Sequence, residues 1–298
     1  MAYSKESAIS AIGLSVAALV FGTTYAIIKD LVSAVHPFLL MTIRFGLAAV
    51  FLSALFAARL RTITWKDVYR GSIIGLFLFL GFWALVVGIV YTTASKQAFL
   101  VGSYVLMVPL LVWLLYKKRP DAYSFAGAGL AAAGIGLLTL DGDLAINPGD
   151  LISILCAFFF ACHIVAIEYY REDLDSVLST IIQFLVTFLA FAALTGIFAS
   201  FELEVSPYRM QLIGYLVLAT TVITFLVQNM AQKHLSSTTT ALILTLETAF
   251  GGIFAVLFLD EAMTAKMIWG SLLVLGGIAA AETKGKLVAG LKRREDAA

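Results

Sequence analysis

The fold is decided by residues 71–90, which read GSIIGLFLFLGFWALVVGIV and contain no charged side chain. A helix of about 20 apolar residues crosses the hydrocarbon core of a bilayer. The run is continuous rather than alternating in polarity, so it does not fit the strands of a membrane β-barrel. The stretch therefore predicts a membrane-spanning helix.

The composition of the whole chain agrees with this reading. Hydrophobic residues make up 61% of the 298 residues and charged residues 13%, whereas soluble domains are roughly half apolar and about a quarter charged. The net charge of +1 and the short basic run Lys292-Arg293-Arg294 give no surface for nucleic acid. We therefore predict an all-α integral membrane protein whose outer surface contacts the lipid bilayer.

Nine further runs resemble the first, which makes ten candidate spans. The run nearest the N-terminus, 8–28, is too long for a cleavable signal peptide, and further membrane spans follow it. Polar or charged residues separate the runs. The predicted spans are 8–28, 36–58, 70–90, 96–116, 123–140, 149–167, 177–200, 208–231, 237–258 and 264–283.

The lysines and arginines predict the orientation of these spans, because they gather on the cytoplasmic side of membrane helices. With the N-terminus inside, 15 of the 20 basic residues fall inside and 4 outside, and Arg44 lies within a span. This division predicts that both termini are cytoplasmic, with a cytoplasmic tail at 284–298.

The second half of the chain repeats the first. Pairs of similar residues coincide when the chain is shifted against itself by 143 residues, as in Gly71/Gly214, Phe82/Phe225, Ala98/Ala241, Gly127/Gly270 and Gly134/Gly277. A shift of 139 residues aligns Arg44-Phe45 with Gln183-Phe184. Five helices is an odd number, so the second half would enter the membrane from the opposite side. We predict two inverted five-helix repeats, at 8–140 and 149–283.

Several segments also resemble a known family. They are residues 92–100 (TTASKQAFL) with 104–111 (YVLMVPLL), residues 228–233 (QNMAQK) with 241–247 (ALILTLE), and the stretch from Pro37 to Phe45. They are similar to ten-helix EamA-type transporters of the drug/metabolite transporter superfamily. Thr248 and Asp260 depart from the family, which often has Pro and Gly there. The resemblance implies a carrier of amino acids, other metabolites or drugs in a bacterial inner membrane, and many such relatives are exporters.

Two charged residues fall within the predicted spans, where polar groups are default functional candidates. Arg44 could bind the carboxylate of a substrate, cap backbone carbonyl groups or pair with an acidic residue. Glu247 could pair with Arg44, bind an amino group or carry a proton. Both are candidate site residues, and Glu247 is the candidate for proton coupling.

Polar and aromatic residues complete the candidate substrate site. His163 could titrate near physiological pH or serve as a packing residue. Gln228 and Asn229 could hydrogen-bond a solute or join helices. Trp83, Tyr25 and Tyr104 could line a cavity or pack in the core.

The pattern as a whole predicts a secondary transporter that moves a small metabolite by alternating access. A multidrug or uptake permease of the same fold remains an alternative, as do an intramembrane enzyme and a receptor. No nucleotide-binding motif occurs, so a proton gradient or facilitated diffusion would drive transport. The two cysteines, Cys156 and Cys162, lack metal-ligand spacing. We expect no cofactor and no metal, and one chain carries both halves, so a monomer would suffice.

Overall fold

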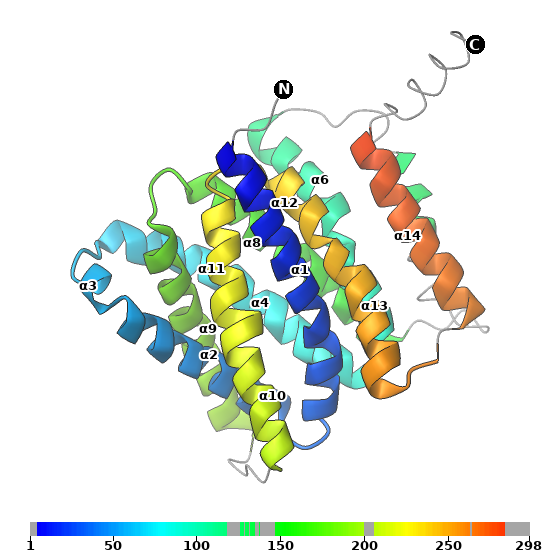
Figure 1. Ribbon diagram of the computed structural model, residues 1–298, viewed down its shortest axis with the longest axis horizontal. Helices are drawn as coiled ribbons and strands as arrows, with labels where there is room; N and C mark the ends of the chain where they lie inside the picture. The colour runs from blue at the N-terminus through cyan, green and yellow to red at the C-terminus, as the bar shows by residue number, and fades with distance from the viewer. Residues whose placement is uncertain are drawn as a thin grey trace.

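A computed structural model describes residues 5–117, 147–199, 206–262 and 264–283, with scattered positions between 126 and 137. The described residues form helices and loops without strands (Figure 1). Most of the predicted fifth span, 123–140, lies outside the described residues, as does the predicted tail, 284–298.

Each of the other nine predicted spans coincides with a helix or a run of adjoining helices. The first repeat contains α1 (Lys5–Leu31), α2 (Pro37–Leu55), α3 (Ala57–Leu60), α4 (Trp65–Tyr91), α5 (Ala94–Gly102) and α6 (Tyr104–Tyr116). The second contains α8 (Pro148–Tyr170), α9 (Ser176–Phe198), α10 (Pro207–Val217), the π-helix η1 (Leu218–Ile223), α11 (Thr224–Ala231), α12 (Ser237–Leu244), α13 (Leu246–Leu259) and α14 (Ala265–Thr283). Within the described residues, eight helical units are long and apolar enough to cross a membrane, and Ala265–Gly277 is a shorter apolar helix.

Local sequence explains where these helices begin. Pro37, Pro148 and Pro207 each stand at a helix start, where the missing N–H of proline costs no hydrogen bond. Thr64 and Asp67 form a capping box at the start of α4, which satisfies backbone donors that would otherwise lack partners.

Three predicted spans are interrupted in their interior, although the sequence predicted continuous helices, and Phe56 divides α2 from α3 near the end of a fourth. Ser103 separates α5 from α6, and Thr245 separates α12 from α13. The Ser103 hydroxyl donates to the carbonyl of Leu100, and the Thr245 hydroxyl donates to that of Ala241. Such side-chain bonds to the preceding turn compete with the helical ladder. The third interruption is η1, which widens the span at 207–231 by a π-turn.

Equivalent helices of the two repeats end in the same way. Lys117 follows α6 with φ 58°, and Asp260 follows α13 with φ 52°. These two residues lie 143 positions apart, which is the shift that aligns the repeats. Asp260 also stands where the family often has glycine, the residue that adopts this left-handed conformation most easily.

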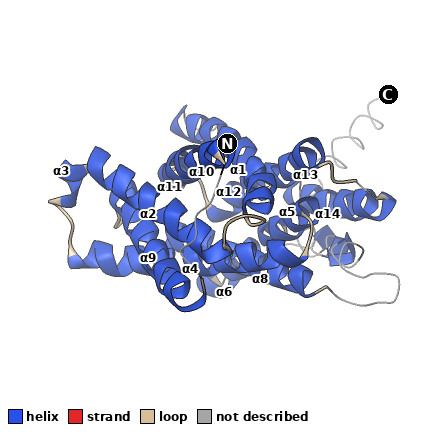
Figure 2. Ribbon diagram, turned by 90° about the horizontal axis from the view of Figure 1, so that it is seen from below, coloured by secondary structure: helices blue, strands red, loops and turns tan. Residues whose placement is uncertain are grey.

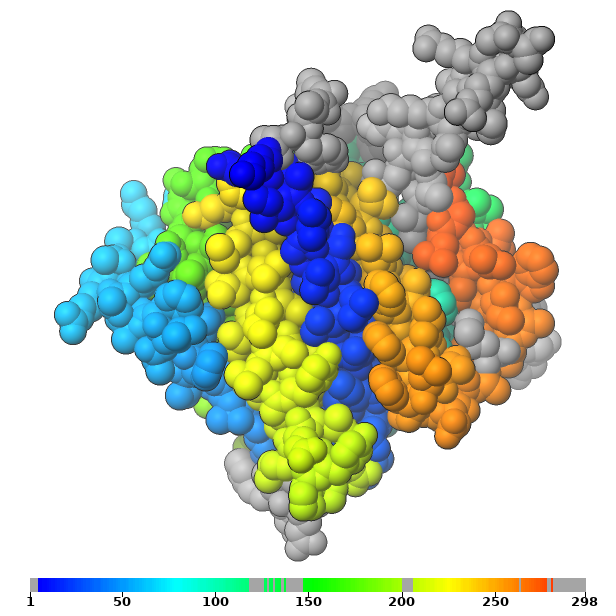
Figure 3. Space-filling model, in the orientation of Figure 1, coloured from blue at the N-terminus to red at the C-terminus, as the bar shows by residue number. Residues whose placement is uncertain are grey.

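Helix packing repeats when the halves are exchanged. On the face shown in Figure 3, α1 lies between α11 and α13, and it packs against both. The corresponding helix of the second repeat is α8. It packs against α4 and α6 of the first repeat, which are the counterparts of α11 and α13. Seen end-on in Figure 2, α2 and α9 lie towards one end of the bundle and α14 towards the other.

The outward surface of the bundle is apolar. Ile12 on α1, Val50 on α2, Leu189 on α9 and Leu257 on α13 are each more than 60% exposed. Exposed aliphatic side chains at this density suit contact with lipid rather than water. The chain is therefore a multi-pass membrane protein.

Candidate functional site

A small cavity lies between the two halves of the bundle. Its lining combines aromatic rings with a few polar groups. The lining residues are Phe21, Thr24, Tyr25, Phe82, Leu85, Tyr104, Phe160, His163, Ile164, Phe225, Gln228, Leu244 and Glu247. An apolar, aromatic wall with a few polar groups is typical of a small-molecule site.

Twelve of the thirteen lining residues form six pairs related by the sequence shifts. The 139-residue shift gives Phe21/Phe160, Thr24/His163 and Tyr25/Ile164, and the 143-residue shift gives Phe82/Phe225, Leu85/Gln228 and Tyr104/Glu247. Two pairs are identical, and the others differ in chemistry. The cavity is therefore similar in shape but dissimilar in polarity across the two repeats.

Glu247 supplies the acidic group of the cavity. It lies in the first turn of α13, where the helix dipole favours negative charge, and its side chain is buried. The Tyr25 hydroxyl donates to Glu247 Oε1 at 3.3 Å. The Tyr104 hydroxyl faces the same carboxyl group, outside strict hydrogen-bond geometry.

His163 and Gln228 complete the polar part of the cavity wall. His163 Nε2 lies 2.9 Å from Gln183 Oε1 on α9, which fixes the orientation of the ring. Gln228 Nε2 donates to Gln232 Oε1 at 3.3 Å. Both side chains are buried and line the cavity.

Phenylalanine rings form the rest of the wall. Phe21 and Phe225 meet edge-to-face at 5.1 Å between centroids, as do Phe82 and Phe160 at 5.3 Å. Phe82 also meets Phe225 at 5.9 Å. This geometry is favourable for aromatic pairs and leaves ring faces available to a ligand.

Arg44, Asn229 and Trp83 lie outside the cavity lining. Asn229 accepts a hydrogen bond from Gln183 Nε2 and donates to the carbonyl of Phe225, so it joins α9 to α11. Trp83 is half-buried on α4 and packs against the core. Of the residues that the sequence singled out, the structure brings together Tyr104, His163, Gln228 and Glu247, with Tyr25.

Arg44 is fully buried beside the π-helix η1 rather than beside Glu247. Its Nε donates to Thr221 Oγ1 at 2.6 Å, and its Nη2 donates to the carbonyl and hydroxyl oxygens of Thr220 at 3.1 Å. The guanidinium group lies 4.6 Å from the centroid of the Phe82 ring, a cation–π distance. Among the described ion pairs, none involves Arg44.

Repeat-related residues also join helices at the two ends of the bundle. Lys29 at the end of α1 donates to the carbonyls of Ile89 and Thr92 at 2.6 and 2.7 Å. Glu168 at the end of α8, 139 positions later, accepts from the backbone N–H of Ser237 at 2.7 Å. Each contact ties the first helix of one repeat to the junction between two later helices.

Sequence reasoning missed the other eight lining residues, among them Phe21, Thr24, Leu85 and Phe160. Their side chains are common in membrane helices, so composition gives no signal. The shifts that align the repeats could have found them, since Leu85 is the counterpart of Gln228 and Thr24 that of His163.

Comparison with known proteins gives concordant results. The EamA-like transporter family matches the chain twice, over residues 8–140 and 147–282. Two proteins of Archaeoglobus fulgidus, each described as an uncharacterized transporter, are similar: one is 30% identical over 264 residues (89% of this chain and 82% of the relative), the other 26% identical over 283 residues (89% and 94%).

A solved structure, described only as the crystal structure of a protein, shares the fold. Its TM-score is 0.68 at 21% identity, over 94% of this chain and 98% of the other. The two family matches together cover nearly the whole chain. The chain therefore belongs to the EamA-like transporter family, within the drug/metabolite transporter superfamily, and is a membrane transporter.

Proposed function

We propose that this protein is a secondary transporter that carries a small metabolite through the central cavity by alternating access. The observation that carries the proposal is the cavity itself, which is lined by six repeat-related pairs of residues drawn from both halves of the chain. A site shared between two repeats can open to one side or the other when the halves exchange conformations.

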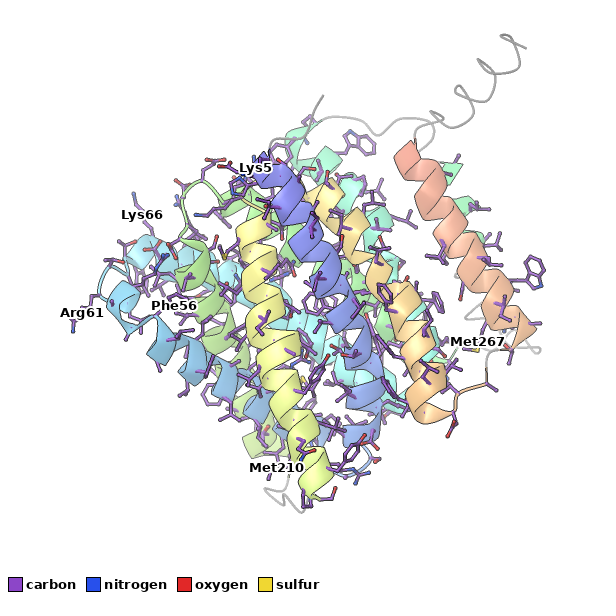
Figure 4. The ribbon with its side chains drawn as sticks, viewed as in Figure 1. Lys5, Phe56, Arg61, Lys66, Met210 and Met267 are labelled. Carbon is purple, nitrogen blue, oxygen red and sulfur yellow. The ribbon has the colours of Figure 1, made fainter. Side chains whose placement is uncertain are left out.

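The proposal includes ten spanning helices arranged as two inverted repeats. Exchange of the halves maps the packing of α1 against α11 and α13 onto that of α8 against α4 and α6, which supports a two-fold relation. Figure 4 places Lys5 and Lys66 towards one edge of the bundle and Met210 and Met267 towards the other. This arrangement agrees with cytoplasmic termini and an N-terminal half that begins inside.

The contacts of Lys29 and Glu168 are suited to act as opposite gates. Each is built from a few polar bonds at one end of the bundle, and the charge count assigns Lys29 to the outer side and Glu168 to the inner side. In an alternating cycle one contact opens while the other stays closed, so solute reaches the cavity from one side at a time.

Within the cavity, Glu247 is the proposed site of proton coupling. A buried carboxyl group that binds either a proton or a solute links the movement of the two. Tyr104, His163 and Gln228 are proposed to contact the solute, while Arg44, Asn229 and Trp83 position the helices around it. The outward direction of net transport rests on the family resemblance.

Flux into proteoliposomes tests this function. Purified protein is reconstituted and challenged with labelled amino acids, amines and carboxylic acids under an imposed pH gradient. We expect flux of at least one solute that responds to the gradient, and Glu247→Gln should abolish that response. No flux of any solute, with correctly folded protein in the vesicles, would contradict the proposal and favour a receptor. An unchanged pH profile in Glu247→Gln would contradict the role of Glu247.

A further inference from the structure

We infer that the cavity selects a small organic monocation, an ammonium group attached to an apolar or aromatic body, over zwitterions and anions. This inference rests on the proposed function and names the substrate class of the same site. It follows from the charge balance, the aromatic wall and the buried Tyr104 hydroxyl group of the cavity.

The charge balance favours a cation. Glu247 carries the one acidic side chain among the thirteen described lining residues, and no lysine or arginine is among them. The remaining titratable neighbours are Tyr25 on α1, Tyr104 on α6 and His163 on α8, whose Nε2 is engaged with Gln183. A solute ammonium therefore finds an ionic partner, whereas a solute carboxylate would be buried without one, which is costly.

Arg44 is not placed to pair with a carboxylate group of a solute in the cavity. Two of its three nitrogens bond to Thr220 and Thr221, and the third, Nη1, is buried without a partner among the described residues. The ring of Phe82, which lines the cavity, lies against its guanidinium group. A carboxylate in the cavity would have to displace this ring before it could reach Arg44.

The aromatic wall suits the same class of solute. Phe21, Phe82, Phe160 and Phe225 surround the cavity with Tyr25 and Tyr104. Ring faces attract an ammonium group within about 6 Å, and they also bury an apolar body. The buried Tyr104 hydroxyl faces Glu247, and its oxygen can accept a hydrogen bond from the ammonium group.

Four probes that share a phenyl ring but differ in charge test this inference. They are phenethylamine (cation), phenylalanine (zwitterion), 3-phenylpropionate (anion) and 2-phenylethanol (neutral), and binding of each to the full chain in lipid nanodiscs is measured by equilibrium dialysis at neutral pH. We expect phenethylamine to bind roughly tenfold or more tightly than each of the others, because only the cation pairs with Glu247 without burying a second charge.

A matched pair of variants isolates the carboxyl group. Glu247→Gln should weaken phenethylamine binding about 100-fold while leaving 2-phenylethanol nearly unchanged, and Glu247→Asp should retain the preference for the cation. Each variant must elute as a monodisperse species, and the wild-type comparison stands even if a variant does not fold.

The outcomes separate this inference from the proposed function. Tighter binding of phenylalanine or 3-phenylpropionate than of phenethylamine would overturn the cation assignment, as would the absence of phenethylamine binding. In either case, flux of another solute in proteoliposomes would leave the transporter function intact. Only the absence of all flux would remove that function.

Discussion

Exchanging Tyr104 with Glu247 moves the acidic group of the cavity to the equivalent position of the other repeat. Both residues line the cavity, and they lie 143 positions apart. If the cavity has two-fold character, a carboxyl group at position 104 still faces the bound ammonium group. The double variant Tyr104→Glu/Glu247→Tyr should therefore retain binding of phenethylamine that Glu247→Gln loses.

The expected loss of phenethylamine affinity can be estimated from the interaction of two charges. An ammonium–carboxylate pair about 4 Å apart is worth up to roughly 4 kcal/mol at an effective dielectric constant of about 20. After part of this is lost to desolvation, Glu247→Gln should cost about 100-fold in affinity, or about 2.8 kcal/mol. In the exchanged protein the carboxyl group remains, but the hydrogen bond from Tyr25 is lost, because Ile164 occupies the position equivalent to Tyr25.

A hydrogen bond to a charged group is worth about 1.5–3 kcal/mol. The Tyr25–Glu247 bond is long at 3.3 Å, so the lower value applies and the exchanged protein should bind about tenfold more weakly than wild type. Adding Tyr25→Ile and Ile164→Tyr transposes the hydroxyl group as well and should recover most of this loss.

Equilibrium dialysis of phenethylamine against the nanodisc-embedded proteins gives the three affinities. The expected order is wild type, then the exchanged protein, then Glu247→Gln, and melting temperatures confirm that each variant is folded. The reasoning is refuted if the exchanged protein is folded but binds no more tightly than Glu247→Gln.

Three further predictions concern stability and the role of Arg44. Lys117→Gly should stabilise the protein by roughly 1 kcal/mol, because φ is 58° at this residue, and a lower melting temperature would contradict the assigned conformation. Gly22→Ala should destabilise it by roughly 1–3 kcal/mol, because the new Cβ would lie 2.6 Å from Phe250 Cβ on α13. Gly214→Ala is the control, since nothing lies within 4 Å of its Cβ position, and equal melting temperatures for these two variants would disprove the close α1–α13 contact. Arg44→Lys should cost about 1–3 kcal/mol of stability, because an ammonium group cannot reproduce the three bonds to Thr220 and Thr221. Its affinity for phenethylamine should stay close to that of wild type, and a selective loss of carboxylate binding would instead make Arg44 a substrate ligand.

The spans could be predicted from the sequence because the bilayer imposes a length on apolar helices. The run 71–90 lies within α4, and the predicted span 8–28 lies within α1. The interruptions at Ser103 and Thr245 could not be predicted in the same way. Serine and threonine are common in membrane helices, and only the local geometry decides whether the hydroxyl group bonds to its own helix and breaks the ladder.

The sequence predicted some residues of the candidate site correctly and also pointed to polar residues that lie outside it. Tyr104, His163, Gln228 and Glu247 attract attention because polar groups are costly at bilayer depth. The same argument picks out Arg44 and Asn229, which bond to Thr220, Thr221 and other helices rather than line the cavity. The cost of burial identifies a polar residue as important but does not say whether its partner is a solute or another helix.

Counterflow of phenethylamine tests the central claim most directly, since a carrier with one alternately accessible site exchanges solute across the membrane. Proteoliposomes are loaded with unlabelled phenethylamine and diluted into a trace of the labelled compound. We predict a transient accumulation of label in wild-type vesicles, and none with Glu247→Gln or with empty vesicles. Label that only equilibrates, with no accumulation for phenethylamine or for any other solute of the panel, would contradict the account of a carrier with its site at Glu247.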